Sequence, residues 1–241
     1  MLFGTTNAST YDFQITITSS NTIEFYSYRA SSQQFDLITS QVLRDPSAWY
    51  HLVAVLDTTN GTSTDRVRLY LNGKRITAFG TASYPSSGAT TPLGDGYTFG
   101  LGARSSTGSY NNGFDGYLAE THFIDGTAYD ATAFGETKNG VWIPKQFAGT
   151  YGTNGFYLKY ADGGALGTDS SGNSNTWTAT NLASTDVMLD SPTNNFATLN
   201  PLKKLNQDTY QGNLRRGVPS WYQQPKLLKA TWSYCGCRRG S

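Results

Sequence analysis

The sequence predicts an all-β protein built as a two-sheet antiparallel β-sandwich. Three observations lead to this fold class. Short segments in which apolar and polar residues alternate recur between turn-forming residues along the chain. Trp49–Leu56 is apolar on both faces, which is typical of a strand in the middle of a covered sheet. Asn72 and Gly73 directly follow an alternating segment, and this pair is the strongest short-range signal for a β-hairpin.

The composition agrees with a turn-rich β protein and excludes several other classes. The 241 residues include 26 Gly and 16 Tyr, and only 15% are charged, against roughly a quarter in average proteins. Helix bundles and coiled coils need Ala, Glu, Lys and Leu at helical spacing, which this sequence lacks. The longest apolar run, Leu52–Leu56, is far shorter than the roughly 18 residues of a membrane span. We expect no signal peptide after Met1.

The first strands can be placed from their alternation. Tyr11–Thr18 is expected to turn Phe13, Ile15 and Ile17 towards the core, and Thr22–Tyr28 alternates in the same way. The doubly apolar segment is expected to divide into a face with Trp49, His51, Val53 and Val55 and a face with Tyr50, Leu52, Ala54 and Leu56.

The remaining elements follow the same reasoning. In the segment Gly116–Phe123, strict alternation sets Glu120 and His122 on one face and Thr121 on the other. Long loops are expected at 80–96 and 105–113. Further strands are expected at Arg66–Leu71, Lys74–Phe79, Tyr97–Gly102, Gly116–Phe123 and Gly155–Tyr160, and a short helix at Asp130–Glu136.

Three segments, in this order, resemble one known family. Asp45–Asp57, Arg66–Lys74 and Phe114–Glu120 are similar to a Trp-x-His strand, an Asn-Gly hairpin and a closing strand of laminin-G-like, concanavalin A-like lectin domains. The resemblance covers roughly residues 1–130 and implies a jelly roll. Such domains usually begin with an earlier strand, so we expect the domain to lack one strand, or to borrow one, before Met1–Gly4.

The second half of the chain resembles a narrower group. Four segments are similar to phage tail-associated, lectin-like proteins of marine viruses. This resemblance implies a structural or adhesion role in a virion, located in a phage tail or fibre, without implying a ligand. The segments are Gly140–Lys145, Gly149–Leu158, Asp169–Asn173 and Asp190–Asn195 with Ala197–Leu202.

The charge distribution divides the chain into a body and a tail. Residues 1–200 contain 10 Lys and Arg against 16 Asp and Glu, whereas residues 201–241 contain 8 basic residues against Asp208 alone. Such a break suggests separate segments. We expect a jelly-roll sandwich at 1–160, a loop-rich wrap or linker at 161–202, and at 203–241 a basic tail that is poorly structured or a truncated next domain.

The basic tail has two interpretations. An anionic partner is one, although nothing in the tail resembles a nucleic-acid-binding module. An incomplete or frame-altered end is the interpretation we prefer. Cys235 and Cys237 lie in this tail. They are too close for an ordinary disulfide and supply only half of a zinc site.

The residues do not form a recognisable catalytic constellation, so we expect no enzyme. Glu120 is the obvious acid for glycoside hydrolysis, but its expected face-mates Leu118 and His122 are not acidic, and such hydrolysis needs paired carboxyl groups. The only histidines are His51 and His122. His51 lies in the most apolar strand, so we interpret it as a hydrogen-bonded core histidine rather than as a catalytic residue.

The loops instead offer the chemistry of sugar binding. Aromatic rings stack on the apolar face of a sugar, and short polar side chains bind its hydroxyl groups. Three of the loop residues, Asp95, Asn112 and Asp115, also offer the oxygen ligands that Ca²⁺ prefers, which makes calcium the one cofactor hypothesis. The candidate ligand-binding residues are Asp95, Tyr97, Tyr110, Asn111, Asn112, Asp115 and Trp142.

Together these observations predict a non-enzymatic module that binds a carbohydrate or a host surface as part of a phage virion or tail protein. The alternative is a purely structural virion protein that contacts neighbouring subunits and binds no sugar. The expected partners are a glycan or host polysaccharide, other virion subunits and further copies of the chain. Neither nucleic acid nor membrane insertion is expected.

Overall fold

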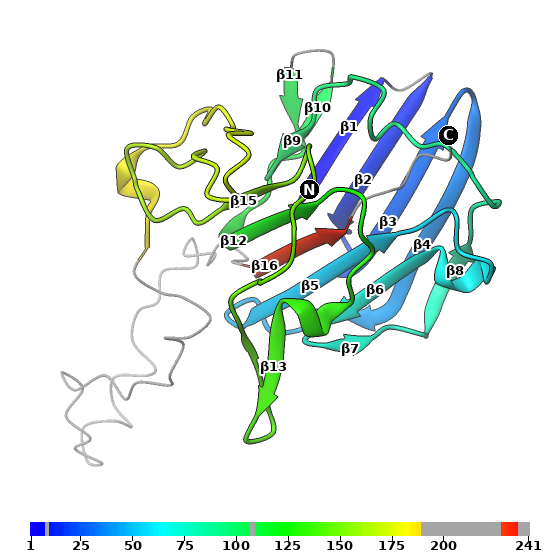
Figure 1. Ribbon diagram of the computed structural model, residues 1–241, viewed down its shortest axis with the longest axis horizontal. Helices are drawn as coiled ribbons and strands as arrows, with labels where there is room; N and C mark the ends of the chain where they lie inside the picture. Colours follow the sequence, from blue (N-terminus) through cyan, green and yellow to red (C-terminus); the bar gives the residue numbers. More distant parts are fainter. Residues whose placement is uncertain (8–9, 107–108, 189–227, 236–241) are drawn as a thin grey trace, which may run out of the picture.

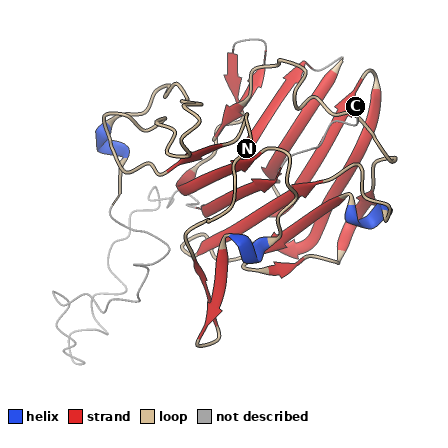
Figure 2. Cartoon of the chain, viewed as in Figure 1, coloured by secondary structure: helices blue, strands red, loops and turns tan. Residues whose placement is uncertain are grey.

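The computed structural model describes residues 1–7, 10–106, 109–188 and 228–235, and it is all-β apart from three single-turn 3₁₀ helices (Figure 2). The strands of these segments form two large sheets and one small hairpin. Within the described part of the chain, no helix is long and apolar enough to cross a membrane.

Sheet A has eight strands, and its pairs are antiparallel except where β10 runs parallel to β1. Its order is β11-β10-β1-β2-β3-β4-β8, with β9 also paired to β1. The bounds are β1 Phe3–Asn7, β2 Tyr11–Ile17, β3 Thr22–Arg29, β4 Ser32–Val42, β8 Phe79–Ser83, β9 Gly100–Leu101, β10 Arg104–Ser106 and β11 Ser109–Asn111.

Sheet B has six strands in the order β15-β12-β16-β5-β6-β7 (Figure 1). A separate hairpin, β13 with β14, lies in the segment that follows β12. The bounds are β5 Trp49–Leu56, β6 Val67–Leu71, β7 Lys74–Arg75, β12 Gly116–Ile124, β13 Gly135–Lys138, β14 Val141–Pro144, β15 Phe156–Leu158 and β16 Leu228–Cys235. The 3₁₀ turns are η1 Ser63–Asp65, η2 Ala131–Ala133 and η3 Ser184–Asp186.

The main core lies between the two sheets, as expected for a sandwich. Phe13, Phe25 and Phe35 come from neighbouring strands of sheet A and meet edge to face, with ring centroids 4.8–6.4 Å apart. Sheet B contributes Leu52 and Leu69 to the same cluster. The predicted all-β sandwich is therefore confirmed.

A second, smaller core covers the other face of sheet B. Val53 and Val55 of β5 pack there against Ile124, Ala131 and Phe134. Because the alternate residues of β5 belong to the main core, this strand is buried on both faces and lies inside its sheet. The prediction made for Trp49–Leu56 is confirmed.

Several predicted elements differ in the structure. Of the expected strand Tyr97–Gly102, only β9 forms, and the expected helix Asp130–Glu136 is the single 3₁₀ turn η2. The alternation expected for β12 changes at a β-bulge between Leu118 and Thr121. Leu118 and Phe123 consequently both pack against the main core, although the strict alternation expected for Gly116–Phe123 would set these two residues on opposite faces. A bulge inserts a residue that strict period-two counting cannot anticipate.

The structure also places a strand in the segment expected to be a poorly structured tail. Leu228–Cys235 is β16, which pairs with β12 on one edge and β5 on the other. The segment does alternate, with apolar Leu228, Ala230, Trp232 and Tyr234 separated by polar residues. The sequence interpretation missed this signal because it gave more weight to the basic charge and the Cys-x-Cys of the tail. Residues 203–227 and 236–241 lie outside the described residues.

The Asn72-Gly73 hairpin supports a stability prediction. Gly73 has a φ of 77°, and an added Cβ would meet the ring of Trp142. Gly96 also has a φ of 77°, but none of the described residues comes within 4 Å of the Cβ it would carry. Gly96→Ala therefore isolates the backbone strain, expected to be about 1–2 kcal/mol. Gly73→Ala should cost about 1–3 kcal/mol more, because the clash with Trp142 adds to the strain.

Chemical denaturation of the two variants measures this difference. Equal losses of unfolding free energy would show that the Trp142 ring does not pack on the hairpin as described.

Candidate functional site

The outward face of sheet A carries a half-buried set of acidic and tyrosine side chains. Phe13 of β2 and Phe25 of β3 point into the core. Because side chains alternate along a strand, the residues on either side of each Phe point outwards. Register then sets Tyr26 opposite both Gln14 and Asp36, and Tyr28 opposite Asp12. We call this set the acidic face, and its members are Asp12, Gln14, Glu24, Tyr26, Tyr28 and Asp36.

The carboxyl groups of the acidic face affect one another. Burial raises the pKa of Glu24, and the nearby charges of Asp36 and Asp12 raise it further. Burial also raises the pKa of Asp36. The pKa of Asp12 is raised by burial although Arg104 and the Thr6 hydroxyl oppose the shift. Three carboxyl groups from three strands therefore share one partly desolvated surface.

Two oxygen atoms of this face are buried without a hydrogen bond. Within the described residues, no donor reaches Oδ1 of Asp12 or Oδ1 of Asp36. Glu24 differs, because its Oε2 accepts a hydrogen bond from Nε2 of Gln14 at 3.2 Å. A buried acceptor without a donor costs free energy, so a rotation of either carboxyl group that brought this oxygen to a ligand's donor would be favourable.

The β10–β11 hairpin borders the acidic face and includes two predicted site residues. Arg104 donates from Nη1 to Oδ2 of Asp12 at 3.4 Å and from Nε to Oδ1 of Asn111 at 3.3 Å. Asn111 therefore joins the acidic face. Tyr110 pairs with the buried Ser105, so it lies on the opposite side of the hairpin, where it is 50% exposed.

Asp95 and Tyr97 are held at the ends of β2 and β3. Both carboxylate oxygens of Asp95 accept hydrogen bonds from Arg29, at 2.7 and 3.3 Å. The ring of Tyr97 stacks on Tyr11, with ring centroids 3.5 Å apart, and remains 36% exposed. Because Tyr11 and Arg29 are paired across β2 and β3, the structure brings Asp95 and Tyr97 to one end of sheet A.

The other two predicted loop residues, Asn112 and Asp115, lie in the connection between β11 and β12. Asn112 has a φ of 52° just after β11, and Asp115 is exposed one residue before β12. Among the residues that the structure describes, no group of three or more His, Cys, Asp or Glu side chains could hold a metal ion. The calcium hypothesis for Asp95, Asn112 and Asp115 stays a prediction, and Asp95 is already paired with Arg29.

Trp142 does not lie with the other predicted residues. It belongs to β14 and packs on the second core, over the outer face of sheet B. Its indole Nε1 donates a hydrogen bond to Nδ1 of His51 at 2.9 Å. Burial lowers the pKa of His51 to about 4, so the ring is neutral at pH 7 and can accept this bond. His51 is thus a hydrogen-bonded core histidine, as the sequence suggested.

His122 has a similar environment. Its ring stacks on Tyr157 with centroids 4.2 Å apart, and its Nδ1 lies 2.8 Å from the hydroxyl of Tyr151. Burial, followed by the proximity of His51, lowers its pKa to about 3. The hydroxyl of Tyr157 donates to Oε1 of Glu120 at 2.8 Å. Glu120 occupies the β12 bulge with a φ of 56°, so this network fixes an irregular strand.

The loop after β15 is held together by a carboxylate that sequence analysis placed in a family-like segment. Asp169 accepts hydrogen bonds from the backbone of Tyr157, Ser171 and Asn175 and from the Ser171 hydroxyl. Burial alone would raise the pKa of Asp169, but these donors hold it below its ordinary value. Asp169–Asn173 therefore has a clear structural role in this chain.

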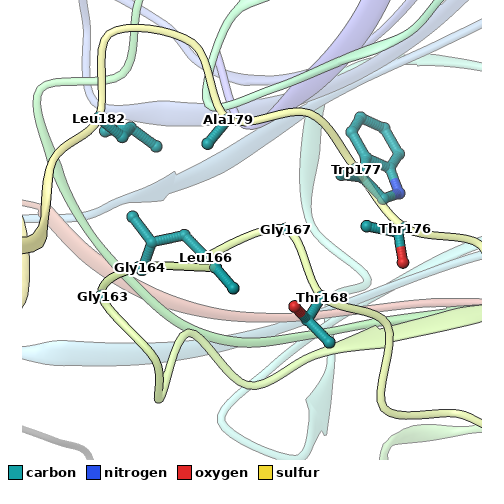
Figure 3. Close-up of a pocket in the computed structure, with 10 residues that line it drawn as sticks. Gly163, Gly164, Leu166, Gly167, Thr168, Thr176, Trp177, Ala179 and Leu182 are labelled. Carbon is teal, nitrogen blue, oxygen red and sulfur yellow. The ribbon is translucent and has the colours of Figure 1, made fainter.

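A pocket of about 250 Å³ lies in the same loop region. Figure 3 shows Trp177 and Thr176 on one side of it and Leu166 and Leu182 on the other. None of its lining residues is charged, so it offers few groups to orient a polyhydroxylated ligand. The lining residues are Gly163, Gly164, Ala165, Leu166, Gly167, Thr168, Thr176, Trp177, Ala179 and Leu182.

Comparison with known proteins identifies the family. A model of the Laminin_G_3 family, described as the concanavalin A-like lectin/glucanases superfamily, matches residues 1–132. This range is more than half of the 241 residues and contains the whole acidic face. Searches of curated proteins and of solved structures found no match. The expected lectin-like family is therefore confirmed, while the resemblance to phage tail proteins stays a prediction.

The buried histidines predict a pH dependence. Between pH 6.5 and about 4, the unfolded chain binds a proton at His51 that the folded protein excludes, so stability falls as the pH falls through this range. The difference between pKa 6.5 and about 4 corresponds to about 3 kcal/mol. His51→Gln retains an acceptor for Trp142 but cannot titrate, so its unfolding free energy should depend less steeply on pH.

Urea denaturation at several pH values from 7 to 4 measures both slopes. The raised pKa values of Asp12, Glu24 and Asp36 have the opposite effect, because they stabilise the folded protein as the pH falls. Their contribution is the same in both proteins, so it cancels when the unfolding free energy of the variant is subtracted from that of the wild type. Identical slopes would mean that His51 is accessible to protons in the folded state.

Proposed function

The chain belongs to the concanavalin A-like lectin/glucanase superfamily, and we propose that it binds carbohydrate, without catalysis, on the acidic face. One observation supports this choice above the others. Tyr26 lies at the centre of three half-buried carboxyl groups, two of which retain a buried oxygen without a donor. Sugar hydroxyl groups are hydrogen-bond donors, and rotation of the carboxyl groups would bring these oxygens to the surface to accept from them.

The chemistry of the acidic face matches a polyhydroxylated ligand. A sugar bound along β3 would contact the rings of Tyr26 and Tyr28. Its hydroxyl groups would donate hydrogen bonds to Asp12 and Asp36. Arg104 already links Asp12 to Asn111, so the β10–β11 hairpin would extend the same binding surface. The ligand would be neutral or cationic, because further negative charge on this face would be unfavourable.

We also propose a finer setting for this activity, a phage tail or fibre protein that attaches to a host surface. The resemblance of segments such as Gly140–Lys145 and Asp169–Asn173 to phage tail-associated lectin-like proteins supports it. Detection of the chain in purified virions with a specific antibody would test the location. A structural virion role without a sugar ligand is the alternative.

Hydrolysis of a glycan is a second candidate, and one feature favours it. Glu24 has a raised pKa beside two other carboxyl groups, and a glycosidase needs a protonated acid near a second carboxylate. If a bound glycan is cleaved over time and Glu24→Gln stops the cleavage while keeping the binding, the protein is an enzyme.

The binding proposal is tested with the full chain on a glycan array, first with calcium and then with a chelator. We expect a saturable ligand whose affinity falls about tenfold in Tyr26→Ala, because an aromatic contact is worth about 0.5–1.5 kcal/mol beyond its buried area. Asp36→Asn should also weaken binding, because an amide is a poorer hydrogen-bond acceptor than a carboxylate. Titration calorimetry measures both effects.

Two controls separate the site from the function. Val141→Ala lies on the exposed β13–β14 hairpin and should leave the affinity unchanged. Tyr110→Ala tests the loops instead of the acidic face. Loss of binding in Tyr110→Ala with normal binding in Tyr26→Ala would move the site to the loops. A folded protein that binds no glycan would favour the structural alternative.

A further inference from the structure

β16 is the strand of sheet B with the most unusual position. It lies between β5 and β12 and runs parallel to both (Figure 1). The register sets Thr231 opposite His51 of β5 and Trp232 opposite Thr121 of β12. The remaining pairs of sheet B, β12–β15, β5–β6 and β6–β7, are all antiparallel.

The connection to β16 is long enough for the strand to reach either its own domain or the domain of a second copy of the chain. Residues 189–227 separate it from the end of the preceding described segment, which is 39 residues of chain. Fully extended, they would span about 130 Å, several times the diameter of a domain of this size. A parallel strand needs such a crossover rather than a hairpin. The connection therefore restricts β16 to its own domain only weakly.

β16 fills a slot whose two edges are β5 and β12. Each of these edge strands is also paired with a strand other than β16. β5 pairs along its other edge with β6, from Leu52 opposite Leu71 to Leu56 opposite Val67. β12 pairs along its other edge with β15. Side chains on both faces of β5 are buried in the two cores. One strand can therefore leave the slot while its walls keep these contacts.

Per residue, the pairing of β16 is less favourable than the antiparallel pairing of its neighbours. Parallel pairs are slightly less stable per residue than antiparallel ones. The bulge at Ala119 and Glu120 also interrupts the β12 ladder opposite Thr231. Exchange of β16 between two copies would replace these contacts with identical ones, so its free-energy cost would be mainly that of bringing two chains together.

We propose that the slot between β5 and β12 is a strand-accepting site, and that its occupant in trans is β16 of a second copy of this chain. At low protein concentration, each chain fills its own slot. At high concentration, two chains exchange their last strands and form a dimer. The partner is thus recognised through main-chain hydrogen bonds along both edges of one added strand.

The first experiment uses the full chain with its own strand disabled. Thr231→Pro removes a main-chain donor from the middle of β16, and proline is excluded from central strands. A labelled peptide of residues 226–235 should then bind this variant saturably in fluorescence anisotropy and raise its melting temperature. A peptide of the same composition in scrambled order is the control. Equal binding of the two peptides would overturn the proposal.

The second experiment keeps β16 intact, which guards against failure of Thr231→Pro to fold. Val55 is opposite Cys235 in the register, so Val55→Cys, made together with Cys237→Ser, offers one pair for disulfide formation. After oxidative refolding, denaturing gels without reductant distinguish a bond within one chain from a bond between two chains. The same variant with Cys235→Ser is the control.

We expect the fraction of disulfide-linked dimer to rise at least severalfold as the refolding concentration increases from micromolar to hundreds of micromolar. Bonds confined to single chains at every concentration would overturn the exchange between copies. Absence of any bond would show that β16 does not occupy the slot, and this also overturns the proposal.

Discussion

The burial of β5 on both faces is the constraint on which the other parts of the structure depend. Leu52, Ala54 and Leu56 close the core against sheet A, while Val53 and Val55 require a second cover on the other side. The segment after β12 supplies that cover with Phe134, Trp142 and Phe147. The indole Nε1 of Trp142 and Nδ1 of His51 then form a hydrogen bond with each other, which lowers the cost of burying these two polar atoms. Residues 125–151 are therefore part of the fold, although the family match ends at residue 132.

The features that the sequence predicted well depend on local rules. The double apolar pattern of Trp49–Leu56 and the Asn72-Gly73 turn each require only neighbouring residues, and both are found as expected. The features that could not be predicted depend on partners distant in sequence. The β12 bulge exists opposite β16, more than 100 residues later in the chain, so period-two counting placed Leu118 and Phe123 on opposite faces although both pack against the main core.

The same distinction applies to the candidate site. Loop composition led to Asp95 and Tyr97, which the structure holds at one end of sheet A. It also led to Trp142, whose position is explained by packing against sheet B. The acidic face was missed, because Asp12, Glu24 and Asp36 stand in three strands and each alone looks like an ordinary outward residue. Only the registers of β2, β3 and β4 bring them around Tyr26. A search for acidic residues at outward positions of successive hairpin strands would have found them.

The proposed binding face and the proposed strand slot belong to different sheets, and this separation has a physical consequence. The main core stands between the acidic face and β16, so the occupant of the slot does not alter the side chains that would contact a sugar. A strand-exchanged pair would nevertheless carry two acidic faces joined by connections of 39 residues. Two weak sites at such a tether length bind a repetitive polysaccharide with an effective concentration near the millimolar range, which strengthens attachment without a new contact. Strand exchange in sheet B would thus strengthen binding at the acidic face of sheet A by raising the number of linked sites, without changing the shape of either site.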